Sequence, residues 1–214
     1  MDQLIEEILS FINRENRRVL IGISGHGAAG KTTFTQKLAE QIGIDQVNIL
    51  NTDPYITDSA VRKNTMITYE WEDQAHKFKM TACHPAAHHM LSLERDIRML
   101  EKGMDLYTLD TEWLPTELLS SEKNAVIAEG MSVAFLDQSL FDLSIYFYTD
   151  GDTEFLRRSG RDIQERGMEL EYLKQSHHQR RVQYEVFMHG YREAFDIVVN
   201  TSGDGFVIKK ENDQ

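Results

Sequence analysis

The chain has 214 residues, of which 41% are hydrophobic, so it is long enough for one α/β domain with a buried core. Its formal net charge of -12 argues against a nucleic-acid partner, which would require a basic face to neutralise phosphates. The single cysteine, Cys83, excludes an intrachain disulfide and favours a reducing compartment. The start of the chain lacks a basic signal segment, and no apolar run approaches the ~18 residues of a membrane span. We therefore expect a cytoplasmic protein without a membrane partner.

Helical periodicity and short β-branched runs alternate along the chain. Apolar residues at helical spacing over 3–14 predict an amphipathic helix, which forms an N-terminal segment of residues 1–17. Short apolar runs predict five strands, at residues 18–23, 47–50, 125–128, 143–148 and 197–199. Further helices are predicted at residues 31–41, 86–102, about 152–166 and about 169–190.

This alternation predicts one domain over residues 1–214, with a three-layer α/β fold. In such a three-layer fold, helices cover both faces of a mostly parallel sheet of about five strands. Ligands of these sheets collect at the carboxyl ends of the strands. We therefore expect Gly25–Thr32, Asp53 and Glu129 to lie near one another, because each follows a predicted strand.

A glycine-rich loop follows the first predicted strand. It reads Gly25-His26-Gly27-Ala28-Ala29-Gly30-Lys31-Thr32, with Thr33 next, and it fits the P-loop pattern. The glycines let backbone N–H groups approach phosphate oxygens, and the helix that begins at Lys31 points its positive end at the anion. Lys31 would reach the β- and γ-phosphates, and the Thr32 hydroxyl would coordinate Mg²⁺. The loop therefore predicts a site for ATP and Mg²⁺ in an α/β fold of the P-loop NTPase type.

The same glycines also match a dinucleotide fingerprint. Gly25, Gly27 and Gly30 spell G-x-G-x-x-G, and Asp53 lies where an acid that binds ribose would sit. Lys31 and Thr32 have no role in that hypothesis, whereas a triphosphate and its metal require both. We therefore favour the triphosphate.

Other motifs narrow the class of P-loop protein. The chain contains no Asn-Lys pair to read guanine, no Asp-x-x-Gly switch and no Leu-Ser-Gly-Gly signature of transport ATPases. A small-molecule kinase remains, and such an enzyme needs a base beside the acceptor hydroxyl, metal ligands and cations that close over the phosphates.

Several blocks are similar to the uridine kinase and phosphoribulokinase-like family of P-loop kinases. The resemblance runs from about residue 19 to residue 199. The blocks are Gly22–Thr33, Ile49–Tyr55, His84-Pro85, Val126–Gly130, Phe147–Asp152 and the arginine-bearing segment Arg157–Gly167. The last block has the Arg-Asp-x-x-x-Arg-Gly spacing of the family's lid, so residues 153–168 are expected to form a helical lid.

The resemblance implies roles for individual residues. Asp53 is the expected general base, and Glu129 the expected carboxylate of the Mg²⁺ site beside Thr32. Tyr55 and His84 are expected to contact the acceptor together with Asp53. The expected lid arginines are Arg158, Arg161 and Arg166, of which Arg161 and Arg166 also contact the acceptor. Arg157 receives no role and is expected to face solvent.

The acceptor side departs from the family pattern. Nucleoside kinases carry Asp where this chain has Cys83, and residues 106–113 replace their Pro-Val-Tyr-Asp segment. Tyr107, Asp110 and Trp113 in that segment could rebuild a pocket. A nucleoside is the leading acceptor. A pantothenate or sugar-phosphate type of acceptor is the second, and an ATP-binding protein without acceptor phosphorylation is the alternative from another class.

Three questions stay open at this point. The first two are the preference between ATP and GTP and the oligomeric state, which could be a homo-oligomer. The third is a metal site, because His84 and His88 are four residues apart with Cys83 beside them.

Overall fold

The computed structural model describes residues 1–166, 170–203 and 205–210. A six-stranded sheet in the order β10-β9-β8-β1-β7-β2 forms the centre. Every neighbouring pair is parallel except β9 and β10, which are antiparallel. The strands are β1 (Val19–Gly25), β2 (Val47–Asn51), β7 (Ala125–Glu129), β8 (Leu143–Tyr148), β9 (Ile197–Asn200) and β10 (Val207–Lys210). The mostly parallel sheet is confirmed, and the antiparallel edge strand β10 adds to it.

The central strands are buried on both faces, as their continuous apolar runs predict. All seven residues of β1 and all five of β7 are buried. Alternate residues of β1 enter different cores: Leu20 lies in one hydrophobic cluster, whereas Ile21 and Ile23 lie in the other. The sheet therefore separates two layers of helices.

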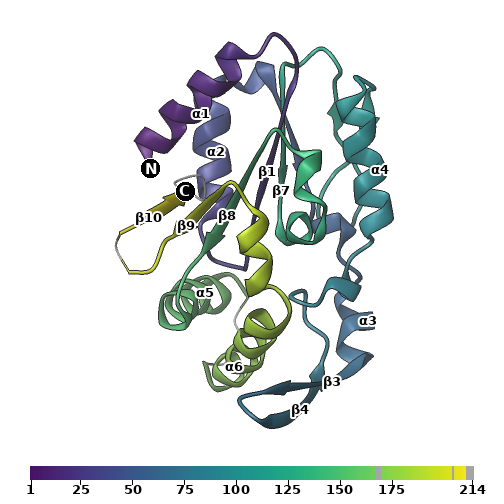
Figure 1. The fold of residues 1–214 in the computed structure, drawn as a ribbon. Coiled ribbons are helices and arrows are strands. Elements are labelled where there is room, and N and C mark those ends of the chain that lie inside the picture. The colour runs from purple at the N-terminus through teal and green to yellow at the C-terminus, as the bar shows by residue number, and fades with distance from the viewer. Residues whose placement is uncertain (167–169, 204, 211–214) are drawn as a thin grey trace.

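Two helices cover one face of the sheet (Figure 1). Helix α1 (Asp2–Arg14) buries Leu4, Ile5 and Ile8, and α2 (Lys31–Ile42) buries Phe34 and Leu38. These side chains share one cluster with the face of β1 that carries Ile21 and Ile23. The amphipathic N-terminal helix therefore packs on its own sheet.

Helix α4 (Met90–Glu101) covers the opposite face (Figure 1). It begins later than the predicted residue 86, because Pro85–Ala87 forms a separate 3-10 turn, η3. Gly103 ends it with φ +73, while the Met104 N–H donates to the Met99 carbonyl at 3.0 Å. Gly103, in this left-handed conformation, directly follows the C-cap residue Lys102 and closes the helix.

Helices α5 (Gly151–Arg166) and α6 (Leu170–Phe187) lie together at the end of the sheet where the strands finish (Figure 1). Asp150 caps α5, because its Oδ1 accepts the Thr153 N–H at 2.7 Å. Helix α6 ends before the predicted residue 190, and a 3-10 helix, η6 (His189–Ala194), continues to β9. None of the helices in the described part of the chain is both long and apolar enough to cross a membrane.

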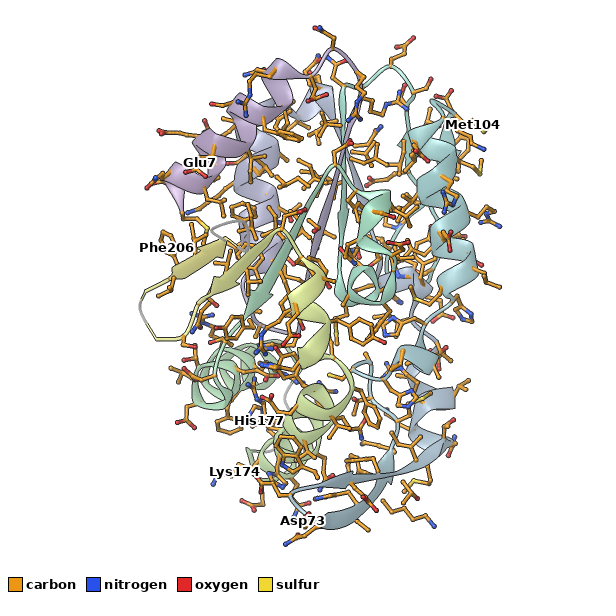
Figure 2. The ribbon with its side chains drawn as sticks, in the orientation of Figure 1. Glu7, Asp73, Met104, Lys174, His177 and Phe206 are labelled. Carbon is orange, nitrogen blue, oxygen red and sulfur yellow. The ribbon has the colours of Figure 1, made fainter. Side chains whose placement is uncertain are left out.

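Smaller elements between β2 and β7 were not predicted. They include α3 (Ser59–Asn64), the hairpin of β3 (Met66–Trp71) and β4 (Gln74–Lys79), and the short pair β5 (Leu106–Tyr107) and β6 (Leu118–Leu119). The hairpin packs against α6. Its tip at Asp73 lies at the opposite end of the molecule from Met104 (Figure 2).

Candidate active site

The glycine loop connects β1 to α2 at the carboxyl edge of the sheet. Gly25 has φ +138, and a Cβ there would overlap the carbonyl oxygen of Phe147 on the neighbouring strand. Only glycine allows the two strands to approach this closely. Gly30 has φ +92 and precedes α2, whose first turn begins at Lys31. The loop therefore faces the positive end of a helix, which is the geometry of a phosphate cradle.

Lys31 and Thr32 are held by the loop and by the adjacent strand. The Lys31 ammonium group donates to the His26 carbonyl at 3.1 Å, and its side chain is nearly buried. The Thr32 hydroxyl donates to Glu129 Oε2 at 3.4 Å. A hydroxyl and a carboxylate oxygen form the donor set that Mg²⁺ prefers, so these two residues fit the metal of an ATP complex.

Glu129 ends β7 and is itself buried. Burial raises the pKa of this carboxyl group, and the charge of Asp53 raises it further, whereas Lys31 and the Thr32 hydroxyl oppose the shift. A cation beside Glu129 would relieve this penalty, because it favours the charged carboxylate.

Asp53 lies on the same edge, just after β2. Asn51 of β2 pairs with Glu129 of β7, and the Thr52 N–H donates to the Glu129 carbonyl at 2.8 Å. The Asp53 N–H donates to Asn51 Oδ1 at 2.9 Å, and Asp53 is exposed. The P-loop, Asp53 and Glu129 therefore lie together, as the positions of the strand ends predict.

Tyr55 lies in the core, where the sequence predicted an acceptor contact. Its side chain is 1% exposed, and its hydroxyl donates to Asp96 on α4 at 2.6 Å. Arg95 pairs with the same carboxylate at 2.6 Å. Because the hydroxyl is used within the protein and the ring is covered, this placement replaces the expected contact with a packing role.

His84 stays partly accessible beside α6. Its Nδ1 accepts the Ala86 N–H at 3.1 Å, which caps η3, and its ring meets Phe187 at 4.5 Å between centroids. Partial burial lowers the pKa of His84 below its ordinary value. Its expected acceptor contact therefore stays a prediction.

The lid arginines lie on α5, after β8. Arg158 is largely buried and its Nη1 lies 3.5 Å from Glu154 Oε1, one helical turn away. The α5 backbone reaches Arg161 and Arg166, but the side chains of these two residues lie outside the described part of the chain. Their roles stay predictions.

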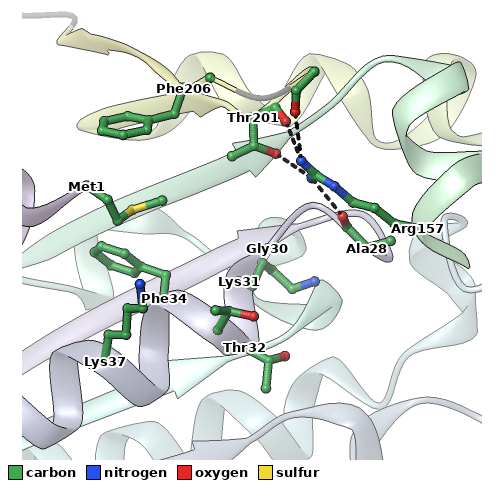
Figure 3. Close-up of a pocket in the computed structure, with 13 residues that line it drawn as sticks. Met1, Ala28, Gly30, Lys31, Thr32, Phe34, Lys37, Arg157, Thr201 and Phe206 are labelled. Carbon is green, nitrogen blue, oxygen red and sulfur yellow. Dashed lines mark hydrogen bonds between the residues drawn. The ribbon is translucent and has the colours of Figure 1, made fainter. Parts of the chain in front are cut away.

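Arg157 contacts the nucleotide loop, although the sequence predicted only solvent around it. Its guanidinium donates to the Ala28 carbonyl at 3.3 Å and to the Thr201 carbonyl at 2.8 Å (Figure 3). It also donates to the Gly203 carbonyl at 3.3 Å. Arg157 therefore links α5, the P-loop and the segment after β9. No spacing in the sequence signals this, because its partners lie far away along the chain.

A cavity of about 600 Å³ opens beside these contacts. Figure 3 shows P-loop residues on one side and the segment between β9 and β10 on the other. Its lining includes Lys31, Thr32, Thr33, Arg157, Thr201 and Phe206. A cavity of this size suits a small ligand such as a nucleotide.

The metal hypothesis for the histidines finds no support. Both ring nitrogens of His88 are used, since Nδ1 meets the Ser132 hydroxyl and Nε2 meets the Ala82 carbonyl, each at 2.8 Å. Burial raises the pKa of the Cys83 thiol to about 12, which leaves it protonated. Among the residues that the structure describes, no group of three His, Cys, Asp or Glu side chains is arranged to hold a metal ion.

The segment 106–113 is the first half of a hairpin in which β5 pairs with β6. Its base is fixed beside the first half of β2, where Asn48 exchanges hydrogen bonds with Ser120. The side chains of Tyr107 and Trp113 are 68% and 62% exposed. Their part in an acceptor pocket therefore stays a prediction.

Comparisons with known proteins agree with this geometry. The model of the phosphoribulokinase / uridine kinase family matches residues 20–206. A uridine kinase of Lactobacillus helveticus (strain DPC 4571) is 31% identical over 88% of this chain and 89% of its own. A uridine kinase of Ligilactobacillus salivarius (strain UCC118) is 30% identical over 91% of both chains.

Solved structures share the fold at lower identity. Phosphoribulokinase from Rhodobacter spheroides superposes with a TM-score of 0.62 and 16% identity, covering 92% of this chain and 81% of its own. D-glycerate 3-kinase from Cryptococcus neoformans superposes with a TM-score of 0.64 and 11% identity, covering 96% and 98%. The family match over residues 20–206, together with the P-loop and its carboxylates, shows that the chain belongs to the phosphoribulokinase / uridine kinase family of P-loop kinases.

Proposed function

We propose that the chain transfers the γ-phosphoryl group of ATP to a hydroxyl of a small molecule, with a nucleoside such as uridine as the leading acceptor. One observation carries the proposal: Lys31, the Thr32–Glu129 pair and Asp53 converge at one edge of the sheet. The two relatives of at least 30% identity, both named uridine kinase, support the choice of acceptor.

The P-loop residues Gly25–Thr33 hold the phosphates in this proposal. Backbone N–H groups and the first turn of α2 face the anion, and the Lys31 ammonium group leaves the His26 carbonyl to reach the β- and γ-phosphates. Thr32 and Glu129 hold Mg²⁺, which neutralises charge on the phosphates when it is bound.

Asp53 serves as the general base. Its carboxylate is exposed at the end of β2 and lies near Glu129, so an acceptor hydroxyl can approach it from the open side. Arg158, Arg161 and Arg166 then close over the transferred group, since forked guanidinium groups match phosphate oxygens. Arg157 shapes the nucleotide cavity from the side of α5.

Cys83 supports a second acceptor class. Nucleoside kinases of the family carry Asp at this position, whereas the Cys83 thiol is buried and stays protonated at neutral pH. A neutral thiol cannot accept strong hydrogen bonds from both hydroxyls of a diol, as a carboxylate does. An acceptor of the pantothenate or sugar-phosphate type, which carries its own anionic group, is therefore the second candidate. A protein that binds ATP without phosphorylating an acceptor is the third.

The acidic charge and the free cysteine support a cytoplasmic enzyme with a small-molecule partner rather than a nucleic acid. We expect ATP to be the phosphoryl donor.

Release of ADP from ATP–Mg²⁺ tests the proposal against a panel of nucleosides, pantothenate and sugar phosphates. Uridine or cytidine is expected to stimulate release strongly, and Lys31→Ala is expected to abolish it. Stimulation by another member of the panel would support kinase activity and identify a different acceptor. Turnover that no acceptor stimulates, with ATP still bound, would favour the third candidate.

A further inference from the structure

A buried carboxylate joins the P-loop to the two helices of the lid region. Glu154, in the first turn of α5, is 4% exposed. Its Oε2 lies 3.5 Å from His26 Nδ1 in the P-loop and 3.5 Å from Arg181 Nη1 on α6. Its Oε1 lies 3.5 Å from Arg158 Nη1 on α5. One side chain therefore touches three functional segments.

The His26 ring is fixed in one tautomer by its neighbours. The Thr149 N–H donates to Nε2 at 2.9 Å, so Nε2 accepts and Nδ1 bears the proton. That proton is shared between the Gly27 carbonyl, at 2.9 Å, and the Glu154 carboxylate. Burial lowers the pKa of His26 to about 4, which keeps the ring neutral at pH 7. The second residue of the P-loop is thus held by Thr149, Gly27 and Glu154 together.

Arg181 completes the link from α6. It donates to the Thr149 carbonyl at 2.8 Å, so the same residue that holds His26 also binds α6. Its guanidinium lies 4.7 Å over the Tyr184 ring, and that ring meets His26 edge-on at 4.5 Å. Glu185 supplies a second carboxylate to Arg181 at 2.6 Å. Arg181 therefore keeps a charge partner even without Glu154.

Arg158 is the second cation that pairs with Glu154. Its side chain is 12% exposed, and the ion pair fixes it on the face of α5 that turns toward the P-loop and α6. His177 on α6 packs beside the same helix, with its ring 5.2 Å from that of Phe155 (Figure 2). A cation directed in this way is preorganised for a phosphate bound in the loop, because little side-chain freedom remains to be lost.

We propose that Glu154 is a positioning residue for phosphoryl transfer, which holds Arg158 and the P-loop residue His26 in one arrangement. The inference rests on the proposed function, since Arg158 is taken as the cation that meets the transferred phosphoryl group. Because Glu154 is 4% exposed, we assign it no contact of its own with nucleotide or acceptor. It acts through Arg158, and this dependence can be measured.

The test is a double-mutant cycle of Glu154→Gln and Arg158→Gln, with kcat and KM measured for ATP and acceptor. Each single variant is expected to lower kcat by about tenfold or more, the loss typical of a charge-assisted contact. The double variant is expected to match Arg158→Gln within about twofold, because His26 keeps its contacts with Thr149 and Gly27 and Glu154 acts on transfer through Arg158. Losses that multiply in the double variant would overturn the proposal.

Glu185→Gln is the matched control. It removes a carboxylate from Arg181 as Glu154→Gln does, but the other ion-pair partner of Glu185 in the described part of the chain is His189 rather than His26 or Arg158. It is expected to keep kcat within about twofold of the wild type. Should Glu154→Gln fail to fold, Glu154→Asp keeps the charge on a shorter side chain and is expected to show the same fall in kcat. Normal kcat in a folded Glu154→Asp variant would overturn the proposal.

Nucleotide binding separates this proposal from the function on which it rests. Calorimetry is expected to show weaker binding of ATP–Mg²⁺ to Glu154→Gln, with ADP–Mg²⁺ binding unchanged, because only ATP carries the γ-phosphate. If the wild type binds ATP but no acceptor stimulates its turnover, the proposed function is refuted. The binding comparison would still test the role of Glu154. Equal weakening of both nucleotides, or of neither, would overturn the role of Glu154.

Discussion

Substituting Gly130 with alanine tests how the backbone holds the two carboxylates of the site. Gly130 follows Glu129 and has φ +147 and ψ -179, a conformation that is essentially restricted to glycine. A Cβ at this position would overlap Thr52 Oγ1 and lie 3.2 Å from Thr52 Cβ. Thr52 is fully buried and is followed directly by Asp53. The substitution therefore strains Gly130 and displaces the chain that bears the proposed base.

The cost follows from these two effects. The backbone conformation costs about 1–3 kcal/mol for a residue other than glycine. Overpacking against Thr52 adds about 1–3 kcal/mol, since the buried threonine has little space to move. A loss of ~4 kcal/mol in the free energy of unfolding lowers Tm by about 8–16 °C in a domain of this size.

Two measurements check this prediction. Thermal unfolding followed by circular dichroism gives Tm, and ADP release gives kcat at a temperature where the variant is folded. We expect kcat to fall, with ADP binding retained, because the P-loop lies on another strand. Gly190→Ala is the control, since a Cβ there would meet nothing within 4 Å. A Tm within about 2 °C of the wild type and normal turnover would refute the reasoning.

Other substitutions and conditions probe separate parts of the account. Arg157→Gln should raise the KM for ATP by about five- to tenfold in steady-state kinetics, because it removes charge-assisted contacts beside the nucleotide cavity. An unchanged KM would show that those contacts do not contribute to ATP binding. Tyr55→Phe should lower the free energy of unfolding by about 1–3 kcal/mol in urea, because Asp96 loses a buried donor. Its turnover should stay normal, whereas a large rise in acceptor KM would restore Tyr55 to the acceptor site. Asp53→Asn should abolish transfer and leave ATP binding largely intact, and near-normal transfer would remove Asp53 as the base. Burial lowers the pKa of His26 and His88 from 6.5 to about 4, so the unfolded chain takes up protons first as pH falls. Tm should therefore be constant between about pH 6.5 and pH 8 and fall between pH 6.5 and 4, and a flat profile down to pH 4 would contradict the burial of both rings.

The central sheet was predictable because its strands are continuous apolar runs. Burial on both faces requires such runs, and glycines mark where β1 and β7 end. The β3–β4 hairpin gave no comparable signal. Its turn places Glu72 and Asp73 at φ +51 and +61, where glycine or asparagine is usual, so the sequence showed no hairpin turn. Packing of the hairpin on α6 holds the turn despite its residues.

The part of the site that follows strand ends was also predictable. Lys31, Thr32, Asp53 and Glu129 occupy positions that topology alone brings to one edge. The sequence predicted an acceptor contact for Tyr55, because the pattern of an aromatic residue after a strand does not distinguish a side chain that faces a ligand from one that packs in a core. Its partner Asp96 lies 41 positions away along the chain, and only the packing of α4 brings the two together.

Residues that act through distant contacts could not be found from spacing. The partners of Arg157, Ala28 and Thr201, lie 129 and 44 positions away, on both sides of it in the sequence. Glu154 meets His26 in the same way, and nothing in its own neighbourhood sets it apart from a surface acid at the start of a helix.

The central claim is that this chain moves a phosphoryl group from ATP to an acceptor hydroxyl at Asp53. The direct measurement is the transfer of label from γ-labelled ATP to uridine, with product separated by chromatography, for the wild type and Asp53→Asn. The account predicts labelled uridine monophosphate with the wild type and none with the variant, although both bind ATP. Labelled inorganic phosphate alone from the wild type, with uridine or any other acceptor of the panel, would contradict it.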